Sequence, residues 1–534
     1  MNHTSFRNHL DRSRLSRRRL LGGAAVGGAS LAAAVIGCGG GEKEEAGAKP
    51  EGGGAAAVKH GSINYGTGST GQSLSPNAAV VSGNPEFQGI FDALTRLNGK
   101  GELEPSLATK WEPDPKDKRR WVFYLRDAEW SDGKPFTAED VKFTFDYIAD
   151  SKTKSAVITR VSSVDAVEIV DKKTVAIINK STGDPIMPRR STEILIQPKH
   201  YIGDPAFGDQ AQATKPIGTG AYLVDEYARD SRIKLKLNPN SWRGTKGVDA
   251  ANILVLRDNQ TRLAAFESAD LDIAGVPLPD IDRVRAQKNV TVTRGIPLGY
   301  NGWDLEYFDP PVSDVRVRLA INHAVDMDQI AKTVFFGLPK PMTQALTEST
   351  FGYNPNIKGY KFDPDLARKL LKEAGVDKLT FKMEYKSGHG TQSPEFAAAT
   401  ADYLKDVGLG TELIPLEINV WRDRLYGRAK RAPMMNNTWA ATAVRDASFV
   451  FVWFLSNDPS DHYDRKDFDD LYNAAVQEFD EEKRKQLWWK IGDMFYDDPP
   501  NNWGVEGASG GSAHRTDKIK EFDEANFLNT FVLA

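Results

Sequence analysis

The pattern of hydrophobic and polar positions in residues 103–148 changes from the period of a strand to the period of a helix. Residues 121–125 are a β-rich run, and the Asp132-Gly133 pair behind it is a turn signal. Residues 137–140, Thr-Ala-Glu-Asp, resemble the start of a capping box. Behind this start, hydrophobic residues recur on one helical face, at Val141, Phe145 and Ile148. The stretch therefore predicts a strand, a turn and an amphipathic helix, in that order.

Two later segments share one set of helix signals. The first runs from Asp363, an N-cap followed by a proline, to Gly375, and the second runs from Ser393 to Gly408. Their apolar faces are Leu366, Ala367, Leu370, Leu371 and Ala374 in the first, and Phe396, Thr400, Tyr403, Leu404 and Val407 in the second. Strand-like segments lie between helices at 232–237, 251–256 and 379–385. This alternation predicts an α/β protein with mixed sheets.

A glycine pattern comes after the first strand-like run of the chain. Gly66, Gly68 and Gly71 have the spacing G-x-G-x-x-G that is typical of dinucleotide-binding loops. Such a loop needs a helix directly behind it, because the pyrophosphate rests on the amides at the start of that helix. The next residues have no helical period and include Pro76. The pattern therefore indicates either a loop whose backbone approaches another ligand or a plain glycine-rich turn.

The N-terminus has the features of an export signal. Residues 1–37 combine the arginines at 17–19 with an apolar, alanine- and glycine-rich stretch that is too short for a mature spanning helix. The paired arginines favour the twin-arginine route over an ordinary secretory signal, the alternative interpretation. The stretch ends in Val-Ile-Gly-Cys, which resembles a lipobox, and Cys38 is the only cysteine of the 534 residues. We therefore expect Cys38 to carry a lipid, and a disulfide within one chain is excluded.

The composition of the chain changes after the signal. Residues 38–57 lack large apolar side chains and are expected to form a flexible tether. The 497 residues from Cys38 onward contain 63 basic and 72 acidic residues, a formal net charge of −9, and no basic stripe that predicts nucleic-acid binding. They also lack a further stretch of 18 apolar residues. We expect a soluble body with at least two cores, held at a membrane by its lipid.

Several blocks of the body resemble the family 5 extracellular solute-binding proteins of ABC importers, which take up peptides, nickel and some oligosaccharides. The first block, "LEPSLATKWEPDPKDKRRWVFYLRDAEWSDGKPFTAEDVKFTFDYI", is highly specific, and the resemblance covers nearly the whole chain after the signal. The other blocks are "PIGTGAYLVDEY" (216–227), "LNPNSWRG" (237–244), "TRLAAFESADLDIAG" (261–275), "DVRVRLAINHAVDMDQIAKTVFFG" (314–337) and "FDPDLARKLLKEAG" (362–375).

The resemblance implies a two-lobed fold of the type II periplasmic binding proteins, with an extra subdomain and a ligand cleft between the lobes. It assigns residues 58–93, 215–300 and 505–534 to lobe I, residues 94–214 to subdomain II, and residues 301–504 to lobe II. It also implies a function without catalysis or cofactor. The chain would capture a peptide or an oligosaccharide-like solute outside the cytoplasm by interlobe closure, and deliver it as a lipid-anchored monomer to an ABC permease.

The resemblance also locates candidate ligand contacts. The loop that contains Gly68, Ser69 and Thr70 matches a cleft-facing loop of lobe I, which favours ligand approach over dinucleotide binding. Aromatic and amide side chains lie where the cleft is expected, because flat rings bind sugars, peptide planes and apolar groups. These candidates are Asn301, Trp303, Trp439 and Trp503.

One family motif is incomplete in this chain. Peptide-binding members have an aspartate three residues after a tryptophan, where it pairs with the α-amino group of the ligand. A gapless match to Trp439 and Phe449 places Thr442 at that position. Arg445 and Asp446 lie three and four residues later and are candidate charged groups of the cleft. The missing carboxylate favours a neutral, hydroxyl-rich ligand or a modified peptide over simple peptides, because a buried ammonium needs a carboxylate partner.

Metal binding and hydrolysis are the remaining alternatives. The eight histidines are scattered without ligand spacing, so the sequence predicts no metal site. Residues 507–511, Gly-Ala-Ser-Gly-Gly, match G-x-S-x-G, with Ser509 as the nucleophile of a lipid-anchored hydrolase. That motif needs a helix and then an acid before the histidine, whereas His514 comes five residues later with no acid between. We therefore expect no catalytic residue.

Overall fold

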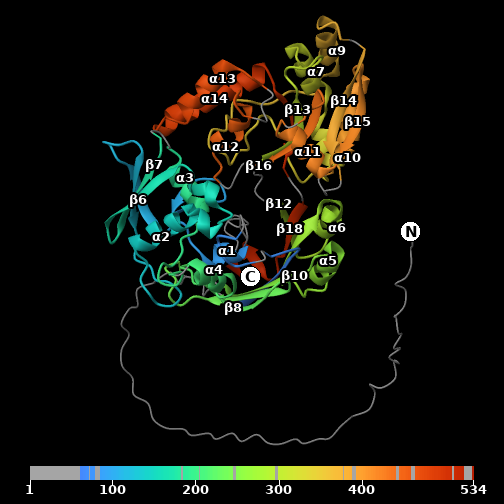
Figure 1. The fold of residues 1–534 in the computed structure, drawn as a ribbon. Helices are drawn as coiled ribbons and strands as arrows, with labels where there is room; N and C mark the ends of the chain where they lie inside the picture. The colour runs from blue at the N-terminus through green and yellow to red at the C-terminus, as the bar shows by residue number, and fades with distance from the viewer. Residues whose placement is uncertain are drawn as a thin grey trace, which may run out of the picture. The chain divides into compact units, whose positions relative to one another are not determined.

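The computed structural model describes residues 61–70, 73–78, 85–181, 185–203, 205–243, 248–294, 299–376, 378–387, 392–427, 429–440, 444–458, 463–507, 510–521 and 532–533 (Figure 1). Cys38, Thr442 and Ser509 lie outside these residues, and so does the side chain of Trp439. Among the helices that are described, none has both the length and the apolar character needed to cross a membrane.

The largest sheet has seven strands in the order β12-β18-β11-β1-β10-β9-β8. Its strands are β1 (Gly61–Thr67), β8 (Tyr222–Ala228), β9 (Arg232–Leu237), β10 (Val248–Val255), β11 (Ile273–Pro277), β12 (Val290–Arg294) and β18 (Gly510–Arg515). The central strand β1 pairs in parallel with both β10 and β11, whereas β18 is antiparallel to its two neighbours. Helices α1 (Pro85–Ile90), α5 (Asn259–Glu267) and α6 (Ile281–Arg285) pack beside this sheet, with the short turn η4 (Leu278–Asp280).

A separate sheet of four strands has the order β4-β5-β7-β6. Its members are β4 (Ala108–Pro113), β5 (Arg120–Leu125), β6 (Val164–Asp171) and β7 (Thr174–Asn179), with α2 (Ala138–Ala149) against it. Trp121, Phe123 and Leu125 alternate into its core, and the Asp140 carboxylate accepts the Thr137 backbone N–H at 2.9 Å, as the predicted strand and capping signal require.

Shorter elements surround the four-stranded sheet. They are the hairpin of β2 (Thr95–Leu97) and β3 (Leu103–Pro105), the helices α3 (Met187–Arg190) and α4 (Pro205–Thr214), and the turns η1 (Ser151–Thr153), η2 (Ile158–Val161) and η3 (Ser191–Glu193).

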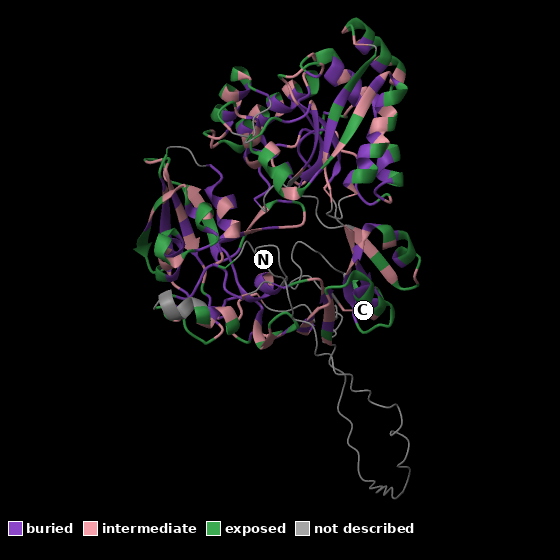
Figure 2. Cartoon of the chain, turned by 45° about the vertical axis from the view of Figure 1, so that its right-hand side comes forward, coloured by how far each residue is buried: buried purple, intermediate pink, exposed green. Residues whose placement is uncertain are grey.

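The third sheet has five strands in the order β15-β14-β16-β13-β17. The strands are β13 (Gly299–Leu305), β14 (Leu379–Lys386), β15 (Leu409–Leu416), β16 (Met434–Ala440) and β17 (Asn501–Glu506). β14 is parallel to β15 and β16, and β13 is antiparallel to β16 and β17. Every residue of β13 and β17 is buried, which is expected for strands covered on both faces (Figure 2).

Helices cover both faces of the five-stranded sheet. Figure 1 shows α10 along β14 and β15, and α13 beside α14. The set comprises α7 (Val315–Ala324), α8 (Met327–Thr333), α9 (Pro364–Glu373), α10 (Ser393–Asp406), α11 (Ile418–Leu425), α12 (Ser448–Phe451), α13 (Lys466–Ala475) and α14 (Glu481–Asp497), with η5 (Val452–Phe454). A last pair of strands joins β19 (Ile519–Glu521) to β20 (Val532–Leu533).

The predicted elements are confirmed, with small shifts at their ends. The expected strand 232–237 is β9, and the expected segment 379–385 is β14 extended by one residue. Helix α9 begins after Asp363, whose Oδ1 accepts the Leu366 backbone N–H at 2.9 Å. Helix α10 differs at its start, because its N-cap is Gln392 and Ser393 already lies inside the helix.

The seven-stranded sheet takes its strands from the segments assigned to lobe I, and the four-stranded sheet takes its strands from subdomain II. The five-stranded sheet comes from lobe II, except that β13 begins two residues before the predicted bounds 301–504 and β17 ends two residues after them. We use these three names below for residues of those segments. The residue boundaries between the lobes stay predictions.

Candidate functional site

Two edges of different sheets are joined by the chain itself. The seven-stranded sheet connects to the five-stranded sheet twice, between β12 and β13 and between β17 and β18. In the first sheet these connections start at the edge where the parallel strands β1, β10 and β11 end, because Pro277 pairs with Gly510. In the second sheet they reach the edge where β14 and β16 end, because Gly299 pairs with Ala440. Ligands of open α/β sheets bind outside such carboxyl ends, so these edges are the candidate site.

The glycine-rich loop lies directly after β1 at the first of these edges. The Thr67 Oγ1 donates to the Ser69 carbonyl at 2.9 Å, which closes a tight turn in which Ser69 is exposed and Thr70 is buried. A Cβ on Gly68 would lie 3.3 Å from the Nη1 of Arg262, so the loop backbone packs against a guanidinium. That Nη1 donates to the Leu256 carbonyl at 2.6 Å, and burial lowers the pKa of Arg262. The loop therefore rests on a fixed cation.

The structure argues against a nucleotide role for this loop. Residues 73–78 form turns where a dinucleotide site needs a helix. Gly66 has a packing reason, because a Cβ at this position would clash with the Leu271 side chain. Gly71 lies outside the described residues.

Polar side chains converge at the second edge, on the face of β13 that carries Asn301. The Nδ2 of Asn436 donates to the Asn301 Oδ1 and to the Gly302 carbonyl, both at 2.9 Å. Next to this pair, the Lys386 ammonium donates to the Thr438 Oγ1 at 3.3 Å. Lys386 and Thr438 are half-buried and offer hydrogen bonds and one positive charge to a polar solute. Asn301 and Asn436 are buried, so contact of Asn301 with a ligand stays a prediction.

The indole of Trp421 packs next to Lys386 at this edge. The ammonium of Lys386 lies 4.9 Å from the ring centre of Trp421, whose Nε1 donates to the Asn436 carbonyl at 2.9 Å. Burial lowers the pKa of Lys386, and the nearby Arg422 acts in the same direction. The lysine is therefore half-desolvated, so an acceptor on a ligand gains more from it than from a fully hydrated surface lysine.

Sequence reasoning did not find Lys386, Thr438, Asn436 or Trp421. A signal existed for the first of them, because Lys386 directly follows the predicted strand 379–385 and its position marks a carboxyl end. The others depend on the neighbours of β16 in the sheet, which the sequence does not show.

Trp303 and Trp503, two of the predicted contacts, lie on opposite faces of the five-stranded sheet. Trp303 is fully buried against Phe396, with ring centres 5.2 Å apart, and its Nε1 donates to the Thr400 Oγ1 at 3.2 Å. Trp503 packs against Tyr300 and Phe495 on the other face. Both are core residues in this structure, so the two indoles do not line one site. Contact of either indole with a ligand stays a prediction.

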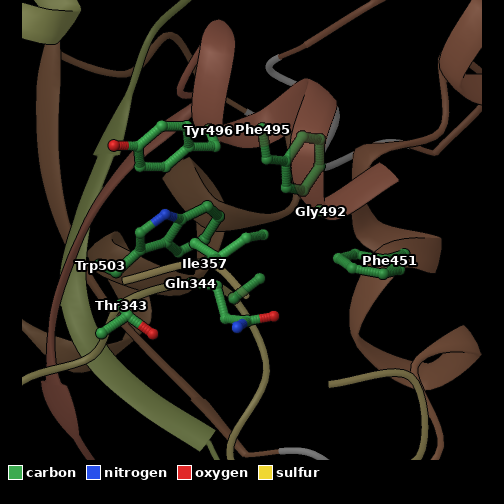
Figure 3. A pocket seen from close by; sticks show the side chains of 9 residues that line it. Thr343, Gln344, Ile357, Phe451, Gly492, Phe495, Tyr496 and Trp503 are labelled. Atoms are coloured by element: carbon green, nitrogen blue, oxygen red, sulfur yellow. The ribbon is translucent and has the colours of Figure 1, made fainter. Parts of the chain in front are cut away.

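Trp503 borders a small cavity within lobe II (Figure 3). Its volume is about 10 Å³, enough for about one water molecule, and its lining is largely apolar. The residues around it are Thr343, Gln344, Ala345, Ile357, Phe451, Gly492, Phe495, Tyr496 and Trp503. A solute of peptide size does not fit this space.

Asp446 is already committed to protein partners. Its side chain is fully buried, and its Oδ1 accepts the backbone N–H and the hydroxyl of Ser448 at 3.1 and 2.8 Å. The Nη2 of Arg484 lies 3.6 Å from its Oδ2. Arg445 is also buried, and its Nη1 donates to the Asn98 carbonyl at 3.2 Å. In this structure neither side chain is open to a solute, so their ligand contacts stay predictions.

The hydrolase alternative lacks its structural context. A nucleophile elbow places the serine between a strand and a helix, whereas here strand β18 begins at Gly510, directly after Ser509. His514 lies within β18, where burial lowers its pKa. Among the described side chains there is also no group of three or more His, Cys, Asp or Glu residues that could hold a metal ion.

Comparison with known proteins gives concordant results. The model of the family described as bacterial extracellular solute-binding proteins, family 5 Middle, matches residues 102–461. In Brucella ovis, a protein named as an ABC transporter peptide-binding protein is 30% identical over 326 residues, which are 60% of this chain and 61% of the length of that relative. The dipeptide-binding protein of Escherichia coli is 26% identical over 450 residues, which are 77% of this chain and 82% of that protein.

Among solved structures, HbpA2 from Haemophilus parasuis matches 89% of this chain and 99% of its own with a TM-score of 0.78 and 21% identity. This likeness confirms the predicted α/β fold.

Proposed function

This chain belongs to family 5 of the bacterial extracellular solute-binding proteins, and we propose on that basis that it is the extracytoplasmic binding component of an ABC importer. It captures a small solute between lobes I and II by closure and delivers it to the permease subunits in the membrane. The members of this family bind solutes and are not enzymes, which confirms the prediction of a chain without catalysis.

The observation that carries this proposal is the pair of sheet edges joined by two crossing segments. The loop of residues 68–70 lies after β1 at one edge, and the group of Asn301, Thr438 and Lys386 lies at the other. A solute held by both edges favours the closed arrangement, because only that arrangement contacts it from two sides.

The solute we propose is a peptide or an oligosaccharide-like molecule. The names of the Brucella and Escherichia coli relatives support the peptide class. The half-buried Lys386 suits a carboxylate or a row of carbonyl and hydroxyl oxygens. In this structure the Asp446 carboxylate accepts from Ser448 and lies 3.6 Å from Arg484, which supports a solute that brings no free amine to it. The proposal therefore includes solutes whose amine is blocked or absent.

The substitution Thr442→Asp tests this specificity. If Thr442 occupies the position of the amine anchor, the new carboxylate should tighten the binding of peptides with a free α-amino group by about ten- to hundredfold, since a charge-assisted hydrogen bond contributes roughly 1.5–3 kcal/mol. Neutral solutes should bind more weakly, because they leave the carboxylate unpaired. Calorimetry with free peptides, N-acetylated peptides and oligosaccharides measures both effects.

The isosteric variant Thr442→Asn is the control for this test, because it has the shape of aspartate without its charge. It should leave the preference among the three panels unchanged. Micromolar or tighter binding of free peptides by the unmutated protein, lost on Asp446→Asn, would assign the anchor to Asp446 instead.

The membrane anchor is a second part of the proposal. Since one thiol is available for acylation, Cys38→Ala should remove the lipid mass and move the protein from the membrane fraction to the soluble fraction. Intact-mass spectrometry and cell fractionation provide the two readouts, and Gly40→Ala, which keeps the thiol, is the matched control. A Cys38→Ala protein that stays on the membrane without a lipid would contradict lipid anchoring.

The solute itself can be identified directly. The full-length protein is purified from its own host without added ligand, denatured, and the released small molecules are analysed by mass spectrometry. The same procedure is applied to an exported protein of another family. Peptides or oligosaccharides that are more abundant in the extract of this chain than in that of the other protein support the proposal. Enrichment of a metal chelate alone would overturn the proposed solute class.

A further inference from the structure

Subdomain II contacts lobe II through two buried arginines, one from each side. Arg189 of α3 donates from Nη1 to the Gly101 carbonyl of its own subdomain at 3.0 Å and to the Val444 carbonyl of lobe II at 3.5 Å. In the opposite direction, Arg445 of lobe II donates from Nη1 to the Asn98 carbonyl at 3.2 Å. Each guanidinium thus binds the backbone of the neighbouring segment. The two arginines form a reciprocal clamp.

Further charged side chains of lobe II, those of Arg484 and Asp446, lie next to this clamp. The ring of Phe351 has the guanidinium of Arg189 at 5.4 Å and that of Arg484 at 4.4 Å from its centre. The fully buried Asp446 is next to Arg445 in the chain and provides the only carboxylate among these residues. We call Arg189, Arg445, Asp446 and Arg484 the arginine latch.

The backbone is shaped to fit this contact. Gly101, in the turn between β2 and β3, has φ +81°, and a Cβ there would clash with the Ser349 carbonyl of lobe II. Arg445 adopts φ +48°, a left-handed conformation that is uncommon for residues other than glycine. The segment of Arg445 is fixed by Phe351, whose N–H donates to the Arg445 carbonyl at 2.9 Å. Both left-handed conformations occur at the contact itself, so the backbone on each side is fitted to it.

The burial of charged side chains lowers the stability of this contact. Arg484 lies 3.6 Å from the Asp446 carboxylate, and Arg189 and Arg445 donate to backbone carbonyl groups across the contact. Burial of cations costs free energy that such contacts offset only in part. Burial lowers the pKa of Arg189, a shift that Asp446 opposes and Arg484 adds to. Separation of the two segments would return Arg189 and Arg445 to water. The return of these cations to water therefore offsets part of the free energy that is lost when the contact breaks.

We propose that the arginine latch sets the equilibrium between closed and open arrangements of lobe II before any solute binds. The chain passes between lobes I and II twice, and the latch is a third connection that holds lobe II against subdomain II without a covalent bond. Because the apparent dissociation constant is the intrinsic constant divided by the fraction of molecules in the binding-competent form, a weaker latch also weakens the binding of every solute alike. The proposal does not depend on the identity of the solute.

Spin-label distances test the latch in the full-length chain without ligand. With Cys38 replaced by serine, the chain has no other cysteine, so labels go to Lys172→Cys in subdomain II and Lys372→Cys in lobe II, both exposed positions. Double electron–electron resonance should show a short-distance population in the otherwise unmutated protein. Arg445→Gln should raise the ratio of long to short distances at least tenfold, because it removes the cation from the Asn98 carbonyl.

Two further variants keep the test decisive. Arg189→Gln breaks the same clamp from the other side and should give the same shift, even if Arg445→Gln unfolds. Arg368→Gln removes an exposed arginine of lobe II that pairs only locally with Asp365, and it should leave the distances unchanged. Unchanged distances in a folded Arg445→Gln or Arg189→Gln protein would overturn the latch. So would the absence of the short-distance population from the unmutated protein.

Discussion

Replacing Asp92 with asparagine is expected to lower the free energy of unfolding by about 3–5 kcal/mol, the range for breaking a buried ion pair. The Asp92 carboxylate is buried and accepts four side-chain donors from segments far apart in the sequence. The donors are the Ser106 Oγ at 3.3 Å, the Thr219 Oγ1 at 2.8 Å, the Trp242 Nε1 at 3.0 Å and the guanidinium of Arg243. An amide accepts through one atom only, so its NH₂ group would face two of these donors.

Urea unfolding followed by fluorescence measures this loss, with the slope checked for constancy between variants. Asp225→Asn is the matched control, because Asp225 is a half-exposed residue of the same lobe that pairs with Lys236 on the surface. Its substitution should change the free energy of unfolding by no more than about 0.5 kcal/mol. Equal effects of the two substitutions would mean that Asp92 does not organise this region.

Trp303→Ala should lower the free energy of unfolding by about 3–5 kcal/mol, as expected for removal of a large buried ring. The Trp303 indole has no exposed surface, packs against Phe396 and donates to Thr400. The substitution leaves a cavity in the core of lobe II and removes the indole donor from the Thr400 Oγ1, which keeps its own bond to the Phe396 carbonyl. Chemical unfolding again provides the measurement.

A second substitution separates this structural role from contact with the solute. Trp303→Phe keeps most of the ring volume, so solute affinity should stay within about twofold, a difference of roughly 0.4 kcal/mol. Trp489→Ala, at a half-buried position on α14, serves as the stability control and should cost less than Trp303→Ala. A Trp303→Phe protein of normal stability with tenfold weaker binding would identify Trp303 as a ligand contact.

The elements with strong local signals were predictable from sequence. The run Arg232–Leu237 alternates as a strand should, and the capping residues at Thr137 and Asp363 mark helix starts that the structure reproduces. Strand β18 had no such signal, because Gly-Gly-Ser-Ala-His-Arg has low strand propensity. It becomes a strand because β11 and β12 pair with it on both sides, a tertiary effect that overrides local preference.

The candidate site was less predictable for the same reason. Trp303 has the residue type of a ligand contact, but its exposure depends on β13 lying between β16 and β17. Asp446 has the charge of an amine anchor, but Arg484, distant in sequence, takes up that charge. Lys386 was overlooked because the sequence shows where a strand ends and not which other strand ends lie beside it. The sequence shows the chemistry of each side chain, whereas the partners of that side chain can be found only from the fold.

The late position of β17 and β18 in the chain has a consequence for biosynthesis. Residues 501–515 complete two different sheets, and 219 residues separate Thr293 of β12 from its neighbour Ser512 in β18. A ribosome-bound chain that lacks this segment leaves strand edges unpaired in both sheets, and such edges template aggregation. Completion of both sheets must therefore wait until residues 501–515 have been synthesised. During that interval the nascent chain needs protection by chaperones or by the export machinery.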